Sequence, residues 1–399
     1  LKDSANIMIL ILIVGGALGI YKKTGAVDNG IASLVAHFGQ RSNTLMLVAF
    51  IVVFSVLGGF LGWIEVLIPF VPLVVAVLLA LGYDSMTAVA ICVVGPMAGF
   101  MAGPTNLYTV AVCNQAAIDL GFVPADYDVL TGLNFRLVLW AVITLVSIVY
   151  IVAYANLVRK DPTKSYCYEE YKNQDASASI GEEVPMTWKR VVALVGFVAL
   201  IVIQGYGCVA LKWSFPNITA LYIIFMILLA ILFQVGPTET CNRFTAGAAR
   251  VLGPALAIGF ANSVMVLLNK ANIMDTLVYY MGNALQGKSP MVTLLIIYIF
   301  VTALNFFVVS GSGKAVMMMP ILSPLGQMLG INQQVMVLTY QLGDGLTNTL
   351  WPAGAVVACS LCGLDFGKWF RFAIKSIGTM MIAAYILIVI ANAIGYGPF

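Results

Sequence analysis

Long apolar stretches divide this chain, and each is separated from the next by a short polar or glycine-rich segment. A helix that crosses the hydrocarbon core of a bilayer needs roughly 20 apolar residues, and several of these stretches approach that length. Backbone groups inside a bilayer must be hydrogen-bonded within the protein, so we interpret the stretches as helices. They lie near residues 5–21, 44–57, 63–81, 86–120, 133–156, 188–211, 218–235, 248–269, 291–309, 314–329, 333–363 and 372–395.

The composition also indicates an integral membrane protein. Only 9% of the 399 residues are charged and 61% are hydrophobic, whereas a soluble domain is roughly 25% charged. This excludes a cytosolic enzyme, a secreted disulfide scaffold and a disordered regulator. The formal net charge of +3 is too small to indicate a nucleic-acid partner. The chain has one histidine and no HExxH or nucleophile motif, so we expect no enzyme.

Basic residues in the loops orient the chain, because loops rich in Lys and Arg face the cytoplasm. Four loops are basic, whereas the loop 121–132 contains Asp126 and Asp128 and no Lys or Arg. We therefore expect a multi-pass protein of the cell (inner or plasma) membrane, with the polar loop 161–187 in the cytoplasm. This orientation requires the pairs 44–57/63–81 and 291–309/314–329 to enter and leave on one side, as re-entrant hairpins do. The basic loop residues are Lys22, Lys23 and Arg41; Arg159, Lys160, Lys164, Lys172, Lys189 and Arg190; Arg243 and Arg250; and Lys368 and Arg371.

The two halves of the sequence resemble each other, which indicates an internal repeat. The matched features are Lys23…Asp28…Arg41 with Lys270…Asp275…Lys288, Gly62…Pro69 with Gly313…Pro320, and GPTN at 103–106 with GLTN at 345–348. The loop charges place the start of the first copy outside and that of the second inside. Such inverted repeats are typical of secondary transporters, although channels can share them.

The predicted fold is an all-α integral membrane protein of two inverted-topology repeats, each with a re-entrant hairpin and a broken transmembrane helix. The first repeat is expected at 1–160, with its hairpin tip near 55–62 and its helix break near 103–106. A cytoplasmic loop at 161–187 and connecting scaffold helices at 188–247 follow. The second repeat is expected at 248–399, with its tip near 310–314 and its break near 343–348.

The helix breaks and hairpin tips indicate where the chemistry lies. A glycine-rich break is tolerated at membrane depth only where protein or a wet cavity surrounds it. Thr and Asn oxygens together with freed carbonyls suit a hard monovalent cation such as Na⁺, and half-helix N-termini suit a carboxylate. The plainer alternative is that the small residues only allow close helix packing.

Charged residues inside apolar elements are functional hypotheses, because a charge at a helix centre costs at least about 2.5–3.5 kcal/mol on insertion scales. Asp344, between two glycines, is expected to bind a cation, either the coupling ion or a substrate amine. Two roles are open for Lys314: binding a substrate carboxylate or neutralising Asp344. Two are also open for Glu65: holding a substrate cation or facing water. Arg136 and Arg371, at helix starts, are expected to extend to the membrane interface.

The segments Ser310-Gly-Ser-Gly-Lys314 and Gly343-Asp-Gly-Leu-Thr-Asn348 resemble those of the YfcC-type carriers. These form the basic-amino-acid-antiporter-like branch of the anaerobic C4-dicarboxylate carrier family, within the ion transporter superfamily. The resemblance runs from about Ile7 to Tyr396. It implies a homodimer with a scaffold domain and a moving transport domain, in which two hairpins and two broken helices enclose the substrate. Such carriers usually have a further membrane helix upstream, so we expect the chain to be part of a longer protein.

The breaks and the resemblance together give the candidate site residues. Those expected to bind substrate are Glu65, Asn106, Ser310, Ser312, Gly313, Lys314, Asp344 and Asn348. Those expected to bind a coupling ion are Ser55, Gly59, Thr105, Asn106, Ser310, Gly343, Asp344, Thr347 and Asn348. We expect no cofactor and no metal beyond Na⁺. The expected partners are a small-molecule substrate, the lipid bilayer and a second copy of the chain.

The predicted function is secondary active transport of a small charged metabolite. The leading substrate is an amino acid such as a basic amino acid, exchanged or cotransported with Na⁺ or H⁺ by an elevator-type movement. The alternative is a carrier of C4-dicarboxylates or other organic anions, which would use Lys314 and the hairpin N-termini. An ion channel would need a continuous polar pore, whereas the sequence contains only isolated helix breaks.

Overall fold

The chain is helical throughout the residues that the computed structural model describes. These residues are 5–26, 43–62, 64, 71–124, 132–173, 187–211, 213, 215–271, 287–308, 310–351 and 354–397, with isolated positions between 273 and 285. Among them no strand occurs, so the all-α class predicted from the apolar pattern is confirmed. In chain order the helices are α1 (Ala5–Lys23), α3 (Asn43–Leu61), α4 (Val71–Ala80), α5 (Ser85–Met101), α6 (Val112–Asp119), α7 (Leu133–Lys160), α8 (Tyr168–Asn173), α10 (Trp188–Ala210), α11 (Phe215–Leu232), α12 (Pro237–Lys270), α14 (Pro290–Leu304), α15 (Gly311–Met328), α16 (Gln333–Gly343), α17 (Gly354–Leu361) and α18 (Phe366–Ala393), with the short turns η3 (Leu107–Ala111), η4 (Pro162–Lys164) and η5 (Leu346–Thr349).

Two of the described helices, α7 and α18, are long and apolar enough to cross a bilayer, judged by length and composition alone. Shorter apolar helices overlap α1, α3, α5, α11 and α14. The backbone of α3 is helical through Leu61, which includes most of the first predicted hairpin tip. Residues 65–70 and Val309 lie outside the described residues, so the re-entrant hairpins stay a prediction.

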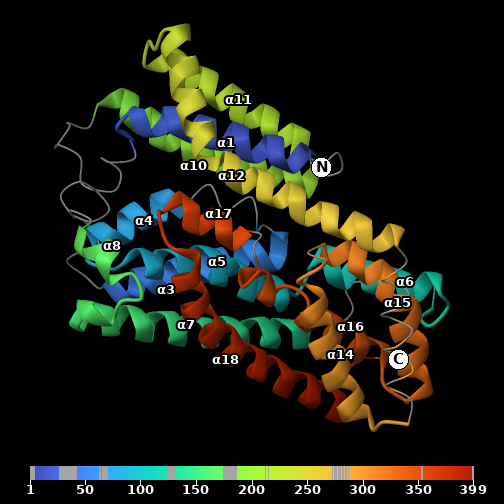
Figure 1. The fold of residues 1–399 in the computed structure, drawn as a ribbon. Coiled ribbons are helices and arrows are strands. Elements are labelled where there is room, and N and C mark those ends of the chain that lie inside the picture. Colours follow the sequence, from blue (N-terminus) through green and yellow to red (C-terminus); the bar gives the residue numbers. More distant parts are fainter. Residues whose placement is uncertain are drawn as a thin grey trace.

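Helices α1, α10, α11 and α12 lie together on one side of the molecule, and the other helices form a second layer (Figure 1). In the first layer Gly19 of α1 packs so closely on Gly247 of α12 that a Cβ there would touch backbone. Tyr21 of α1 stacks on Phe197 of α10, with ring centroids 4.8 Å apart. α12 is continuous across residues 247 and 248, between which the sequence placed the boundary of the second repeat. α1, which the sequence placed in the first repeat, lies beside α10, α11 and α12 in the structure (Figure 1).

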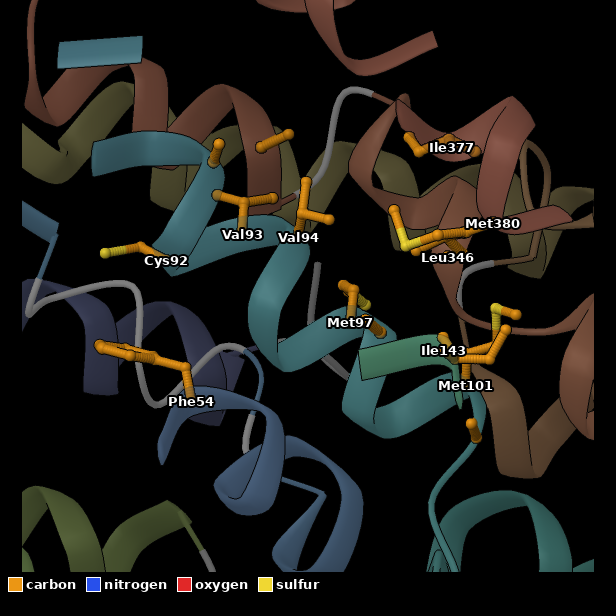
Figure 2. Packing of buried hydrophobic residues seen from close by; sticks show 14 of the residues in the cluster. Phe54, Cys92, Val93, Val94, Met97, Met101, Ile143, Leu346, Ile377 and Met380 are labelled. Atoms are coloured by element: carbon orange, nitrogen blue, oxygen red, sulfur yellow. The ribbon is translucent and has the colours of Figure 1, made fainter. Parts of the chain in front are cut away.

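Two fully buried helices form the centre of the second layer. Every residue of α5 and of α16 is buried. Figure 2 shows Met97 and Met101 of α5 in the same apolar core as Ile143, Leu346 and Met380, which come from α7, η5 and α18. Because α5 and α16 are buried all round, any interruption at their ends is surrounded by protein.

Close backbone contact joins α3 to α5. A Cβ on Gly58 would overlap the Pro96 carbonyl oxygen, and one on Gly99 would overlap the Ser55 carbonyl oxygen. Small residues that let two helix backbones approach are a common device of membrane helices. At these glycines the packing role that the sequence left as an alternative is therefore present.

The segment after α7 folds back and ties the two halves of the chain together. Asp84, which caps α5, accepts hydrogen bonds at 2.6 Å from both Tyr154 and Ser165. Glu170 of α8 pairs with Lys368 of α18 at 2.6 Å. The hydrogen bond from the Lys368 ammonium holds the pKa of Glu170 below its usual value. The first residues of the predicted cytoplasmic loop thus dock onto the helical core.

The α3–α5 contact predicts a matched pair of glycine variants. Gly99→Ala should lower the midpoint of thermal unfolding, because overpacking a tight contact costs about 1–3 kcal/mol. Gly378→Ala on α18 should leave the midpoint equal or higher, since no atom lies within 4 Å of the added methyl. Thermal unfolding of the purified protein in detergent measures both. Equal losses in the two variants would contradict the close contact.

Candidate functional site

The second of the two predicted helix breaks, here called an interruption, lies inside the core at the end of α16. α16 ends at Gly343, and Asp344 takes extended backbone with φ −90° and ψ 133°. Gly345 has φ +118°, a conformation that residues with a side chain rarely adopt. The chain then continues as the short turn η5 before α17 begins. This turn holds the Asp344 side chain in the protein interior, where it is 0% exposed.

A buried ion pair joins this interruption to the start of α15. Ser310 caps α15 by accepting the Gly313 amide at 3.2 Å, and Lys314 lies in the first turn. Lys314 Nζ lies 2.6 Å from Asp344 Oδ1, with the two side chains 0% and 1% exposed. A buried charge is costly unless it is paired, and each of these charges supplies the partner that the other needs.

Asn305, at the end of α14, connects the two elements. Its amide nitrogen donates to the Gly343 carbonyl at 3.0 Å and to Thr347 Oγ1 at 2.9 Å. Its amide oxygen accepts a hydrogen bond from Lys314 Nζ. Lys314 also donates to the Val308 carbonyl at 3.2 Å. One amide side chain therefore serves the freed carbonyl of α16, the following turn and the lysine.

The interruption after α5 faces the interruption after α16. Asn106 caps η3 through its oxygen and donates from its nitrogen to the Phe100 carbonyl at 2.8 Å. Gln341 of α16 donates to the Gly103 carbonyl at 2.8 Å. A Cβ on Gly345 would lie 3.1 Å from the Phe100 ring. The two interruptions, one from each half of the sequence, thus contact each other directly.

The second oxygen of Asp344 has spare hydrogen-bonding capacity. Oδ2 is buried and accepts no hydrogen bond from the part of the chain that the structure describes. It faces Gly311, where an added Cβ would overlap it and would lie 3.2 Å from Thr109. Tyr340 of α16 holds Gly311 at this position by donating to the Gly311 carbonyl at 2.6 Å. One carboxylate oxygen is therefore on Lys314 and the other is directed at the start of α15.

Several predicted site residues gather around this ion pair. Gly343 and Thr347 are held by Asn305, and Ser310, Ser312 and Gly313 form the start of α15. Asn348 lies in η5, and its Oδ1 accepts no hydrogen bond among the described residues.

Other predicted site residues make contacts that do not include the pair. Ser55 Oγ lies 2.7 Å from Thr144 Oγ1 and accepts the Trp140 indole N–H at 3.0 Å. A Cβ on Gly59 would meet the Gly99 carbonyl oxygen of α5 at 2.9 Å. These two residues join α3 to α5 and α7. Thr105 donates to a carbonyl of α3 at 3.3 Å, and Glu65 lies outside the described residues.

Sequence reasoning missed Asn305 and Gln341, although both carried a usable signal. Each is an amide side chain in or directly after an apolar helix, and polar residues at such depth usually bind across to another element. Neutral amides are a weaker marker of a buried site than charged residues, so the sequence predicted the site from its charges.

The expectation that Arg136 extends to the interface is wrong. Its side chain is 0% exposed, and its guanidinium donates to Gln334 Oε1 at 2.7 Å. Gln334 in turn donates to Asn114 Oδ1 at 2.8 Å. Arg136 therefore ties the start of α7 to α16 through Gln334, and Gln334 extends the connection to α6.

The chain resembles a known family of transporters and a named antiporter. A family model described as C4-dicarboxylate anaerobic carrier, DcuC, matches residues 1–393. The Escherichia coli K12 protein named "Putative basic amino acid antiporter YfcC" is 30% identical over 407 residues, covering 98% of this chain and 78% of that protein. An uncharacterized Haemophilus influenzae protein is 29% identical over 404 residues, covering 97% and 75%.

Two solved structures are also similar to the chain. Neisseria gonorrhoeae MtrF, from a class of antimetabolite efflux pumps, is 16% identical with a TM-score of 0.42, covering 97% of this chain and 81% of that one. The Alcanivorax borkumensis YdaH transporter is 17% identical with a TM-score of 0.46, covering 98% and 86%.

The family match and the relatives define the class: a membrane-embedded transporter, not an enzyme. The chain belongs to the C4-dicarboxylate anaerobic carrier (DcuC) family. The family resemblance seen in its glycine-rich segments is thereby confirmed.

The Asn305 contacts predict a specific loss of stability. Asn305→Ala removes two donors and one acceptor from buried partners and should cost about 1–3 kcal/mol, since the groups left behind are unsatisfied. Gln327→Ala, at an exposed position of α15, is the matched control and should change little. Thermal unfolding in detergent compares them. An unchanged midpoint for Asn305→Ala would show that the network does not hold the interruption together.

Proposed function

We propose that the protein is a secondary active carrier for a small charged metabolite, and that its substrate is a basic amino acid. Substrate binds where the interruptions after α5 and α16 meet the start of α15. Asp344 binds the cationic group of the substrate, and the exchange or cotransport is coupled to H⁺ or Na⁺. An elevator-type movement of the α3–α7 and α14–α18 layer against the α1–α10–α11–α12 layer, within a homodimer, alternates access.

The observation that carries the proposal is the buried Asp344 carboxylate. Among the described residues its Oδ2 accepts no hydrogen bond, and this oxygen faces Gly311, which lies beside Thr109 of η3. A carboxylate oxygen with spare acceptor capacity suits an ammonium or guanidinium group. The name of the Escherichia coli relative, "Putative basic amino acid antiporter YfcC", supports the same substrate class.

A C4-dicarboxylate is the second candidate, and Lys314 favours it together with the family description. The ammonium at the first turn of α15 and the amides of that helix start would bind a carboxylate. In the structure this ammonium already has Asp344 as its partner. A dianion would therefore have to compete with a buried carboxylate, which makes it the weaker candidate.

Counterflow in liposomes distinguishes the candidates. Liposomes containing the purified protein are preloaded with unlabelled arginine, ornithine or lysine, or with succinate or fumarate, and uptake of the matching labelled compound is measured. The proposal predicts counterflow for the basic amino acids only. Counterflow for the dicarboxylates only would show that the substrate is a dicarboxylate and would make Lys314 the residue to test next.

The role of Asp344 predicts loss of transport in a charge-balanced variant. Asp344→Asn alone leaves Lys314 buried without a counterion, which costs about 3–5 kcal/mol. The double variant Asp344→Asn with Lys314→Met removes both charges and should unfold near the wild-type midpoint. Its counterflow of basic amino acids should nevertheless fall to that of empty liposomes. Asp119→Asn, at an exposed end of α6, should transport normally, and normal counterflow in the double variant would remove Asp344 from the site.

A further inference from the structure

The Lys314 ammonium is enclosed by oxygen atoms. Asp344 Oδ1 lies 2.6 Å from Nζ, the Val308 carbonyl oxygen lies at 3.2 Å, and Asn305 Oδ1 completes the set. The ammonium donates hydrogen bonds to Asn305 Oδ1 and the Val308 carbonyl and forms an ion pair with Asp344 Oδ1. The lysine side chain is 0% exposed. Nζ therefore occupies a defined position bounded by one carboxylate, one amide and one backbone carbonyl.

These three oxygens are the ligand types that a hard monovalent cation prefers. Carboxylate, side-chain carbonyl and backbone carbonyl oxygens suit hard cations in proteins. The backbone oxygen comes from Val308, just past the end of α14, where the chain has left the helix. The positive charge of the lysine balances the negative charge of Asp344. In ligand type and in charge, the position of Nζ has the character of a cation site.

We propose that this position is a monovalent-cation site that the protein fills with its own lysine. Lys314 takes the place that a free ion such as Na⁺ would otherwise hold on Asp344, Asn305 and the Val308 carbonyl. Wild-type protein then needs no Na⁺ at this position. This inference deepens the proposed function by naming how the buried carboxylate is neutralised. Its relevance to transport rests on the proposed function, whereas the cation site itself does not.

The chemistry of burial explains why a built-in cation matters. A carboxylate in a low-dielectric interior requires a counter-charge. A carrier that depends on a free ion reaches its neutral state only when that ion is bound. A tethered ammonium is present in every state of the protein, so the ion pair neutralises Asp344 whatever the Na⁺ concentration. Removing the ammonium should expose the latent site to ions from solution.

The test uses thermal unfolding of the purified full chain in detergent, in NaCl and in choline chloride of equal ionic strength. The midpoint of wild-type protein should differ between the two salts by no more than that of the double variant Lys314→Met with Asp344→Asn, which lacks the carboxylate of the proposed site. Lys314→Met should unfold lower than wild type in choline, and saturating Na⁺ should raise its midpoint by about 3–5 °C, as a ligand bound only to the native state does. Lys314→Met combined with Asp344→Asn should lose the Na⁺ response. Lys164→Met, at an exposed lysine, should behave as wild type.

Two results would overturn the inference. A saturable, Na⁺-specific rise in wild-type protein that is larger than the rise in the double variant Lys314→Met with Asp344→Asn would mean that the ion binds on Asp344 although Lys314 is in place. A folded Lys314→Met protein with no Na⁺ response would mean that the pair is structural and encloses no cation site. If Lys314→Met does not fold, Lys314→Gln is measured in the same way and the wild-type arm still decides. Because no arm uses a transported substrate, failure of the counterflow assay and failure of the cation site are separate outcomes.

Discussion

Two buried helices stop inside the protein, and the backbone groups that they release must find partners there. Water is not present in a hydrocarbon core to supply them, and each unsatisfied group costs several kcal/mol. Asn305 binds the freed Gly343 carbonyl, Gln341 binds the Gly103 carbonyl, and Asn106 caps the turn that follows. The rest of the second layer is arranged so that these amides reach those carbonyls. The interruptions are therefore stable features of the core.

The same requirement explains why the ion pair and the interruptions occur together. The amide nitrogen of Asn305 donates to the carbonyl at the α16 interruption, and its amide oxygen accepts from Lys314. One side chain therefore binds both the freed backbone carbonyl and the lysine of the ion pair. Gln341 belongs to α16 but binds the other interruption. The contacts of Asp344 with Lys314 and of Lys314 with Asn305 thus link the ion pair to the carbonyl at the end of α16.

Much of the fold and part of the site could be predicted from the sequence. The apolar stretches gave the helices, and the charges Lys314 and Asp344 stood out because few charged residues lie in apolar segments. The contact between the two was one of two roles left open, since spacing alone does not fix how α15 meets α16. Arg136 was misplaced because the amides that surround it come from other helices. Neutral amides such as Asn305 carry a weak signal by themselves, and their role depends on which carbonyls tertiary packing brings to them.

If the two halves form the internal repeat that the sequence predicts, their comparison bears on the pairing of these charges. In the match of Gly62…Pro69 with Gly313…Pro320, Trp63 stands where the second half has Lys314. In the match of GPTN with GLTN, Ala102 stands where the second half has Asp344. Both charges are thus absent from one half and present in the other. A buried acid without its base, or the base without its acid, would leave one uncompensated charge in the core. The joint replacement of the two by apolar residues is the pattern expected if neutralising Asp344 is the principal task of Lys314, whether or not substrate is bound.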